Sequence, residues 1–268
     1  MSIPKKIHYC WFGKSKLPEL AQKCINSWKK YCPEYDIVEW NEDNFDLNSN
    51  AYVKEAYEAK KWAFVSDYVR LFVLYRYGGI YMDTDVEIIR SLDVFLENKA
   101  FSGFESNSFI TTGIMASERG GEWVKLMLSY YNNRHFKLSD GTLDLTTNVV
   151  SITKLTKKNY DIALDNTLQI TNGDIVFYPS EYFCPKDFKT GKINITPNTY
   201  TIHHFTGSWH TEEEKKNIRH RQKIKRIFGE KIGSYVLSAE WIFKEKGMKW
   251  VLKKIYLKTF HKNVKKEI

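Results

Sequence analysis

The sequence predicts an α/β domain with a mainly parallel central sheet, followed by a basic helical extension. Over the first 90 residues, short apolar segments typical of strands alternate with longer segments of helical periodicity, the order expected when helices cover a parallel sheet. After residue 211 the composition changes to a charged helical pattern. We therefore expect one domain over residues 1–211 and a helical extension over residues 212–268.

The apolar periodicity places each element along the domain. The segment 62–77, for example, puts Val65, Val69 and Val73 on one helical face, and Gly78 and Gly79 end the helix. The expected helices cover residues 20–31, 51–61, 62–77, 120–133 and 148–158. The expected extended segments cover residues 5–13, 35–41, 80–82, 100–106, 109–117, 174–185 and 199–209.

The positive charge of the protein is concentrated in the extension. Residues 215–268 hold 17 Lys and Arg against 4 Asp and Glu, so they carry +13 while residues 1–214 carry −4 of the total charge of +9. This asymmetry indicates an anionic partner for the extension. Lysines mix there with apolar residues in a basic amphipathic pattern, which either lies on a membrane surface or packs on the domain.

Localisation is inferred from what the sequence does not contain. It has no apolar run long enough to span a bilayer and no secretory signal pattern. We therefore expect a cytoplasmic protein, with peripheral contact at the inner face of the cell membrane through the basic extension. No recognised nucleic-acid-binding motif accompanies the basic residues, so no nucleic acid is expected as a partner.

Two carboxylates follow the buried strand 80–82. Because side chains alternate along an extended chain, Asp83 and Asp85 point to the same side while Thr84 turns away. Ligands of open α/β sheets bind beyond the carboxyl ends of the strands, and paired carboxylates there suit Mg²⁺ or Mn²⁺. The alternative is a pair of acids that only cap the next turn.

The preceding helix carries an acid and a base on one face. Asp67 and Arg70 are three residues apart on an otherwise apolar helix that two glycines join to the strand before Asp83. An exposed ion pair at this spacing would contribute only about 0.2–0.5 kcal/mol. The alternative is that the pair serves a ligand, because a carboxylate can bind sugar hydroxyls and a guanidinium can bind oxygen atoms.

These motifs together resemble a known family. The segments "IPKKIHYCWFG" and "SDYVRLFVLYRYGGIYMDTDVE", with weaker matches at "TTGIMAS" and "HHFTGSW", resemble the DXD-containing sugar transferases of glycosyltransferase family 32. They are also similar to the glucosylating domains of the large clostridial toxins. The resemblance covers about the first 210 residues. It implies a GT-A fold, a nucleoside-diphosphate sugar donor, a divalent cation (Mn²⁺ or Mg²⁺) and retention of the anomeric configuration.

The resemblance also implies roles for individual residues. Asp85 would be the direct metal ligand and a catalytic residue together with Arg70. The donor would be bound by Trp11, Asp67, Arg70, Asp83, Ser208 and Trp209, with Trp11 stacked on the base. For Trp11 the alternative is an ordinary core position.

Two further assignments rest on weaker grounds. The toxins use a carboxylate near the last loop as a metal ligand, whereas this sequence offers histidines there, and we assign His204 to that role; a histidine bonded only to backbone is the alternative. Asn107 and Asn148 are expected in loops on the acceptor side, although asparagine is also an ordinary turn residue.

The function expected is therefore transfer of a sugar from a nucleoside-diphosphate sugar to a glycan or a lipid-linked glycan. A UDP-sugar is favoured over a GDP-sugar, and the product would belong to capsular or other cell-surface polysaccharide. One alternative is a metal-dependent phosphohydrolase that uses the same aspartates. Another is a non-enzymatic protein that binds a sugar or a nucleotide.

Overall fold

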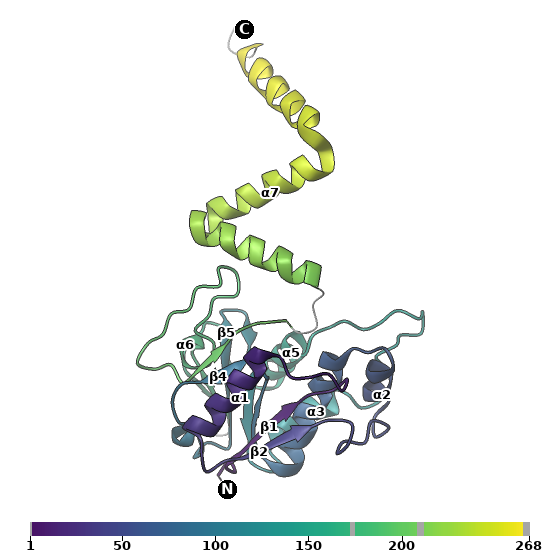
Figure 1. Cartoon of the computed structure of the whole chain (residues 1–268), viewed down its shortest axis with the longest axis vertical. Helices are drawn as coiled ribbons and strands as arrows, with labels where there is room; N and C mark the ends of the chain where they lie inside the picture. Colours follow the sequence, from purple (N-terminus) through teal and green to yellow (C-terminus); the bar gives the residue numbers. More distant parts are fainter. Residues whose placement is uncertain (1, 172–174, 208–211, 265–268) are drawn as a thin grey trace. The chain divides into compact units, whose positions relative to one another are not determined.

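The computed structural model describes residues 2–171, 175–207 and 212–264 (Figure 1). The chain forms two compact units. One comprises Met1–Lys186 and Ile193–Trp209, and the other comprises Asp187–Lys192 and His210–Ile268. We describe each unit by itself.

The first unit begins with the predicted alternation of strands and helices. Its elements up to the aspartate pair are β1 (Lys6–Cys10), α1 (Glu19–Tyr31), β2 (Asp36–Trp40), α2 (Ala51–Glu58), α3 (Trp62–Tyr77) and β3 (Gly79–Met82). The remaining elements are β4 (Val86–Ile88), the short 3₁₀-helix η1 (Asp93–Phe95), β5 (Ala100–Ser106), β6 (Phe109–Ile110), β7 (Ile114–Ser117), α4 (Glu122–Ser129), α5 (Asn148–Asn159), β8 (Gln169–Thr171), β9 (Ile175–Tyr178), α6 (Ser180–Phe183) and β10 (Thr201–His203).

The central sheet has the strand order β2-β1-β3-β7-β5-β9-β8, and β6 pairs with β5 outside this path. Strands β2, β1, β3, β5 and β9 point in one direction, whereas β7 and β8 run against them. The fold class predicted from the sequence, α/β with a mainly parallel sheet, is confirmed. Strands β4 and β10 form a separate antiparallel pair.

Side-chain alternation along the strands gives the sheet an apolar layer on each face. In β3, Tyr81 belongs to one buried cluster, which includes residues of α2, α3 and α4. Ile80 and Met82 belong to the other cluster, which includes residues of α1 and α6. Strand β3 is therefore buried on both faces, as expected for a central parallel strand.

The two glycines between α3 and β3 are required by the local geometry. Gly78 and Gly79 have φ angles of 68° and 108°, which side chains other than hydrogen rarely allow. A Cβ atom on Gly79 would lie 2.8 Å from the backbone oxygen of Lys6 on β1. The glycines thus end α3 and let β3 start directly beside β1, which fixes where the aspartates after β3 emerge.

The second unit contains α7 (Glu212–Val264), which provides the predicted C-terminal helix. The helix is interrupted at Gly229, whose φ angle is 74°. Nε2 of His220 lies 2.8 Å from Oε2 of Glu240, although a straight helix would separate residues so far apart in sequence by about 30 Å. The first part of α7 therefore folds back as a helical hairpin. Across the described ranges, no helix combines the length and apolar character needed to cross a membrane.

Candidate active site

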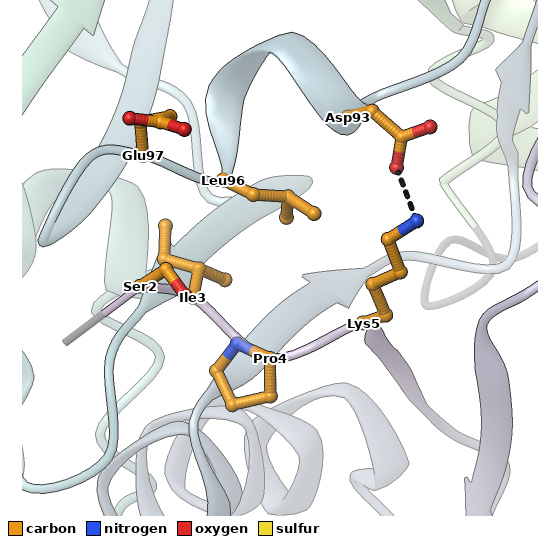
Figure 2. A pocket seen from close by; sticks show the side chains of 7 residues that line it. All are labelled: Ser2, Ile3, Pro4, Lys5, Asp93, Leu96 and Glu97. Carbon is orange, nitrogen blue, oxygen red and sulfur yellow. Dashed lines mark ion pairs between the residues drawn. The ribbon is translucent and has the colours of Figure 1, made fainter.

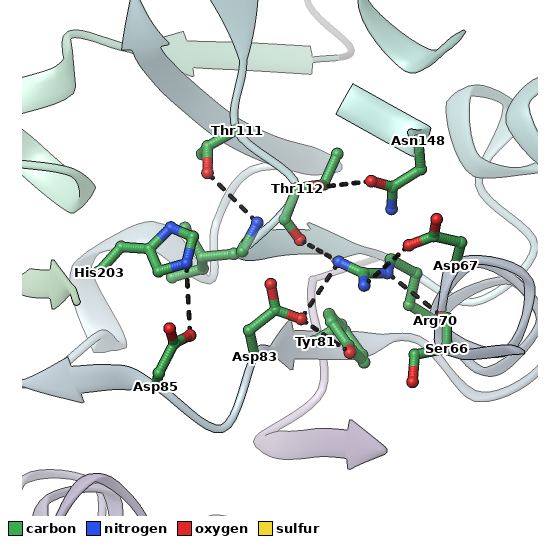
Figure 3. Close-up of polar contacts among 12 residues, drawn as sticks. Ser66, Asp67, Arg70, Tyr81, Asp83, Asp85, Thr111, Thr112, Asn148 and His203 are labelled. Carbon is green, nitrogen blue, oxygen red and sulfur yellow. Dashed lines mark hydrogen bonds and ion pairs between the residues drawn. The ribbon is translucent and has the colours of Figure 1, made fainter. Parts of the chain in front are cut away.

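The aspartate pair lies at the edge of the sheet where the parallel strands end. Trp11 follows β1, Asp83 follows β3, and Glu105 lies near the end of β5. These strands point in the same direction, so their carboxyl ends share one edge, which is where open α/β sheets bind ligands. Polar side chains from α3, β3, the segment before β7 and β10 meet there (Figure 3).

Strand pairing brings a histidine to the second aspartate. In the β4–β10 pair, His203 lies opposite Val86, the residue that follows Asp85. Nε2 of His203 is 3.3 Å from Oδ1 of Asp85, and Thr206 donates two hydrogen bonds to Oδ2, from its backbone N–H at 2.7 Å and from its hydroxyl at 2.8 Å. Asp85 thus joins the aspartate loop to the segment after β10.

Burial and hydrogen bonding act in opposite directions on Asp85. Burial alone would raise the pKa of this carboxyl group, but the charge of His203 and the hydrogen bonds from His203 and Thr206 outweigh it and hold the pKa well below its usual range. Opposing effects also act on His203. Burial alone would lower its pKa, but the charge of Asp85 outweighs burial and raises the pKa above its usual value. An anionic Asp85 is therefore available as a ligand at neutral pH.

Close packing against Gly113 holds the ring of His203 in place. A Cβ atom on Gly113 would lie 2.7 Å from Cε1 of the imidazole, so any larger residue here would displace the ring. The backbone oxygen of Gly113 also accepts a hydrogen bond of 2.9 Å from the N–H of Asp83. The glycine of the "TTGIMAS" segment is thus in contact with both sides of the site.

Arg70 connects most of the remaining polar groups. It donates to the backbone oxygen of Thr112 at 2.7 Å and to Oδ1 of Asp67 at 3.1 Å, and its Nη1 lies 3.3 Å from Oδ1 of Asp83. The guanidinium also lies over the ring of Tyr81, 4.5 Å from the ring centre, and the hydroxyl of Tyr81 donates to Asp83. The first carboxylate of the pair is therefore positioned by one arginine and one tyrosine.

The pair Asp67–Arg70 is buried, so its interpretation as an exposed ion pair is wrong. Asp67 and Arg70 are only 7% and 5% exposed. Burial raises the pKa of Asp67 to about 7; the charge of Arg70 lowers it, and that of Asp83 adds to the rise. Burial of this kind follows from the position of α3 on the sheet, which spacing along the helix could not reveal.

Asn148 is the first residue of α5 and 5% exposed, so its expected place in a loop is wrong. Its Oδ1 accepts a hydrogen bond of 3.0 Å from the hydroxyl of Thr112. Its buried Nδ2 has no hydrogen-bond partner within the part of the chain that the structure describes. Figure 3 shows the Asn148 amide on the same side of the site as Asp67 and Arg70. Such a donor is available to a ligand.

Three side chains could hold a divalent cation. One ligand atom each from Asp83, Asp85 and His203 lie within 4.8 Å of one another. Two carboxylates and a neutral imidazole form a donor set suited to Mn²⁺, and Mg²⁺ is less favoured by the imidazole. Cation binding would displace the proton that Asp85 stabilises on His203. The residues present therefore fit the cation that a DXD site implies.

The histidine of this cluster is His203, which corrects the assignment of His204. Nε2 of His204 lies 2.9 Å from Oε2 of Glu87, and only its backbone N–H reaches Asp85. Neighbouring residues of an extended segment point to opposite sides, so only one of the two histidines can face the aspartates. The two adjacent histidines in the sequence indicated that one of them could face the aspartates. Which of the two does so depends on the pairing register of β10 with β4.

The other predicted residues are placed less closely around the aspartates. Trp11 is half-buried just after β1, where its Nε1 donates to the backbone oxygen of Ser15. Asn107 is exposed in the turn between β5 and β6. Ser208 and Trp209 lie outside the described residues. Thr206 and Thr112 were not predicted, because hydroxyl residues in loops carry no distinguishing pattern.

A hollow of 340 Å³ elsewhere on the domain does not contain this chemistry. Figure 2 shows it beside Pro4, Leu96 and the ion pair of Lys5 with Asp93, whose Nζ and Oδ1 are 3.3 Å apart. These residues precede β1 and β5, so the hollow lies at the amino ends of the strands. The ligand-binding edge of the sheet is the opposite one.

The comparisons with known proteins agree with this site. Residues 18–102 match the family model described as "Glycosyltransferase sugar-binding region containing DXD motif". This range includes Asp67, Arg70, Asp83 and Asp85. The matched region is thus a glycosyltransferase sugar-binding region that lies in the first part of the α/β domain. The predicted resemblance to the DXD glycosyltransferases is confirmed by this match.

Among curated proteins, the chain is 32% identical over 147 residues to "Inositol phosphoceramide mannosyltransferase 3" of Schizosaccharomyces pombe. The matched region covers 50% of this chain and 40% of that protein. The chain is 32% identical over 127 residues to "Mannosyl phosphorylinositol ceramide synthase CSH1" of Saccharomyces cerevisiae, 43% of this chain and 31% of that protein. The chain thus spans less than half the length of either relative.

Two solved structures show more distant similarity. "PaToxG Glycosyltransferase" has a TM-score of 0.45 and 17% identity, covering 59% of this chain and 70% of that one. A complex of the galactosyltransferase LgtC with donor and acceptor sugar analogues has a TM-score of 0.42 and 13% identity. The match covers 80% of this chain and 94% of that one.

Proposed function

We propose that the protein is a metal-dependent glycosyltransferase that moves a sugar from a nucleoside-diphosphate sugar to a hydroxyl group of a glycan or lipid-linked acceptor. The observation that carries the proposal is the convergence of Asp83, Asp85 and His203 within 4.8 Å at the carboxyl end of β3. Arg70 lies beside the first of these carboxylates, with its Nη1 3.3 Å from Oδ1 of Asp83. The matched DXD region supports the sugar-binding part of the assignment.

The cation would be held by Asp83, Asp85 and His203. When bound, it supplies positive charge that stabilises the departing diphosphate. Arg70 adds positive charge at the same edge. Asp67 and the free Nδ2 of Asn148 offer an acceptor and a donor of hydrogen bonds, which suits the hydroxyl groups of the donor sugar.

The proposed step conserves the anomeric configuration. The oxygen of the acceptor hydroxyl forms a bond to the anomeric carbon. The bond from that carbon to the phosphate oxygen breaks, and its electron pair leaves with the diphosphate. The proton of the hydroxyl passes to a diphosphate oxygen on the same face of the sugar. This route needs no protein nucleophile, and none is evident in the sequence motifs.

The names of the relatives suggest which substrates to test first. They describe mannosyl transfer to inositol phosphoceramide, a lipid whose polar head bears hydroxyl groups. A nucleoside-diphosphate mannose and a hydroxylated lipid head group therefore join UDP-sugars and cell-surface glycans as substrates to be tested.

A panel of UDP- and GDP-sugars tests the proposal. With Mn²⁺ present, we expect one donor to raise the melting temperature, because a ligand that binds only the folded state stabilises it. The same donor should release nucleoside diphosphate when an acceptor is added. Phosphate release from simple phosphoesters would favour the phosphohydrolase instead, and binding without any release would favour a sugar-binding protein.

A further inference from the structure

Glu105 has features that its place in the sheet does not require. It lies on β5 where the pairing with β6 is irregular. Phe104 pairs with Ile110 and Ser106 pairs with Phe109, so Glu105 is an extra residue with no counterpart on β6. A bulge of this kind redirects a side chain, and bulges are frequent beside active sites.

The carboxylate of Glu105 has no hydrogen-bond partner among the residues that the structure describes. Burial is the main influence on it and raises its pKa, the charge of His203 lowers the pKa, and the charge of Asp83 adds to the rise. By contrast, Asp67 and Asp85 each accept a hydrogen bond from the protein. Glu105 is half-buried, and a half-buried carboxylate without a partner in the protein is suited to accept hydrogen bonds from a ligand.

Glu105 lies beside the cation site without belonging to it. Its charge interacts with those of Asp83 and His203, but its carboxylate is not one of the groups whose ligand atoms lie within 4.8 Å of one another. The segment before β7 separates it from Asp83. In that segment Thr111 donates to the backbone oxygen of Gly103 on β5, and Gly113 accepts from the N–H of Asp83.

We propose that Glu105 binds the acceptor, with its carboxylate accepting a hydrogen bond from a hydroxyl group of a polyhydroxylated acceptor. Asp67, Arg70 and Asn148, which we propose for the donor, lie on α3 and α5. Glu105 stands on the β5 side, where the unsatisfied carboxylate meets the ligand-binding edge of the sheet. This role rests on the proposed function.

The test compares Glu105→Gln with Glu97→Gln in the full-length protein. The first change removes the charge with little change in shape. The second is a matched control, because Glu97 is exposed and precedes β5 at the opposite edge of the sheet. The acceptor is chosen first, with the wild-type protein and the donor found in the panel. The candidates are methyl glycosides, myo-inositol 1-phosphate and a membrane lipid extract, and the one that most stimulates release of nucleoside diphosphate is used.

Three quantities are then measured for each variant. They are the Mn²⁺-dependent rise in melting temperature caused by nucleoside diphosphate, donor hydrolysis without acceptor, and the kcat/KM for the acceptor. For Glu105→Gln we expect the first two to stay close to wild type. The acceptor kcat/KM should fall roughly 10- to 100-fold, mainly through KM, as expected for loss of a charged hydrogen bond. Glu97→Gln should match wild type in all three.

Two results would overturn the inference. Unchanged acceptor kinetics in a folded Glu105→Gln protein would show that the carboxylate does not contact the acceptor. Loss of the Mn²⁺-dependent effect of nucleoside diphosphate would place Glu105 in the donor or cation site instead. If Glu105→Gln fails to fold, the same three quantities are measured for Glu105→Asp, which keeps the charge but shortens the side chain. The same two results would then overturn the inference. A wild type that binds donor but transfers to no acceptor would refute the proposed function itself, and the role of Glu105 with it.

Discussion

At the scale of single residues, Arg70 contacts more of the polar groups at the α3 side of the site than one ion pair requires. It neutralises Asp67 and contacts Asp83 from a position that is only 5% exposed. As an exposed ion pair, Asp67 and Arg70 would contribute only about 0.2–0.5 kcal/mol, and the burial of both side chains corrects that expectation. Removing one partner of a buried pair leaves an uncompensated charge.

We therefore predict that Arg70→Ala lowers the free energy of unfolding by about 3–5 kcal/mol. Urea titration followed by circular dichroism measures this loss. The control is Arg76→Ala, which changes an exposed arginine of the same helix and should have little effect. Equal stability of the two variants would contradict the buried-pair account.

Because the pKa of Asp67 is raised in the folded protein, the direction in which the free energy of unfolding changes with pH can be predicted. The carboxyl group titrates near 3.8 in the unfolded chain and at about 7 in the folded protein. The folded state therefore holds the proton more tightly, and the free energy of unfolding falls as pH rises from about 4 to 7. At about 1.4 kcal/mol per pH unit, the upper limit of this loss is about 4 kcal/mol.

Asp67→Asn removes this dependence, because the amide does not titrate. Urea unfolding in EDTA should show the variant gaining stability relative to wild type between pH 4.5 and 7.5. The difference is the informative quantity, since other groups titrate in both proteins. Parallel stability curves over this range would show that Asp67 keeps an ordinary pKa.

At the scale of elements, the sequence predicted most of the domain because its strands and helices have clear apolar periods. Helix α3 begins and ends at the predicted residues, Trp62 and Tyr77, since an apolar face and two glycines mark it. The candidate residues Asp67, Arg70, Asp83 and Asp85 could be located on and beside α3 and β3 for the same reason. The predicted helix 148–158 also begins at the residue where α5 begins, Asn148, which shows that the separate expectation of a loop position for Asn148 was wrong.

Pairs formed by distant strands could not be predicted in this way. Which histidine faces Asp85 depends on the register Val86–His203 between β4 and β10, segments that are more than 100 residues apart. A one-residue shift would exchange the two histidines. Local sequence contains no information on that register.

The register predicts opposite results for the two neighbouring histidines. His203→Ala should remove a cation ligand and weaken Mn²⁺ binding by at least about 10-fold. His204→Ala loses only the contact with Glu87 and should bind Mn²⁺ almost as wild type does. Isothermal titration with Mn²⁺ and nucleoside diphosphate measures both affinities. A larger loss in His204→Ala would contradict the observed register.

At the scale of the whole molecule, the uneven charge is the feature that the catalytic chemistry does not explain. We propose that the extension brings the protein to an anionic membrane surface, where lipid-linked acceptors would be presented. Basic residues near such a surface contribute roughly 1 kcal/mol each, and salt screens the attraction. The competing account is that the apolar side of the extension packs against protein.

Liposome sedimentation distinguishes the two accounts. We predict that the protein sediments with phosphatidylserine vesicles at low salt and is released as the salt concentration rises. Replacing Lys249, Lys253 and Lys254 with glutamate should abolish sedimentation while leaving transfer to a soluble acceptor unchanged. Sedimentation that is insensitive to these changes, or absent in the wild type, would favour the packing account.

The most direct test of the central claim is the release of nucleoside diphosphate from the preferred donor, measured with and without Mn²⁺, in wild type and Asp85→Asn. Asp85 is held as an anion beside His203, so its replacement should remove the cation-dependent reaction while the protein stays folded. We predict that release of nucleoside diphosphate by the wild type requires the cation and is stimulated by an acceptor, and that EDTA reproduces the effect of Asp85→Asn. Full turnover by a folded Asp85→Asn protein in EDTA would contradict the account.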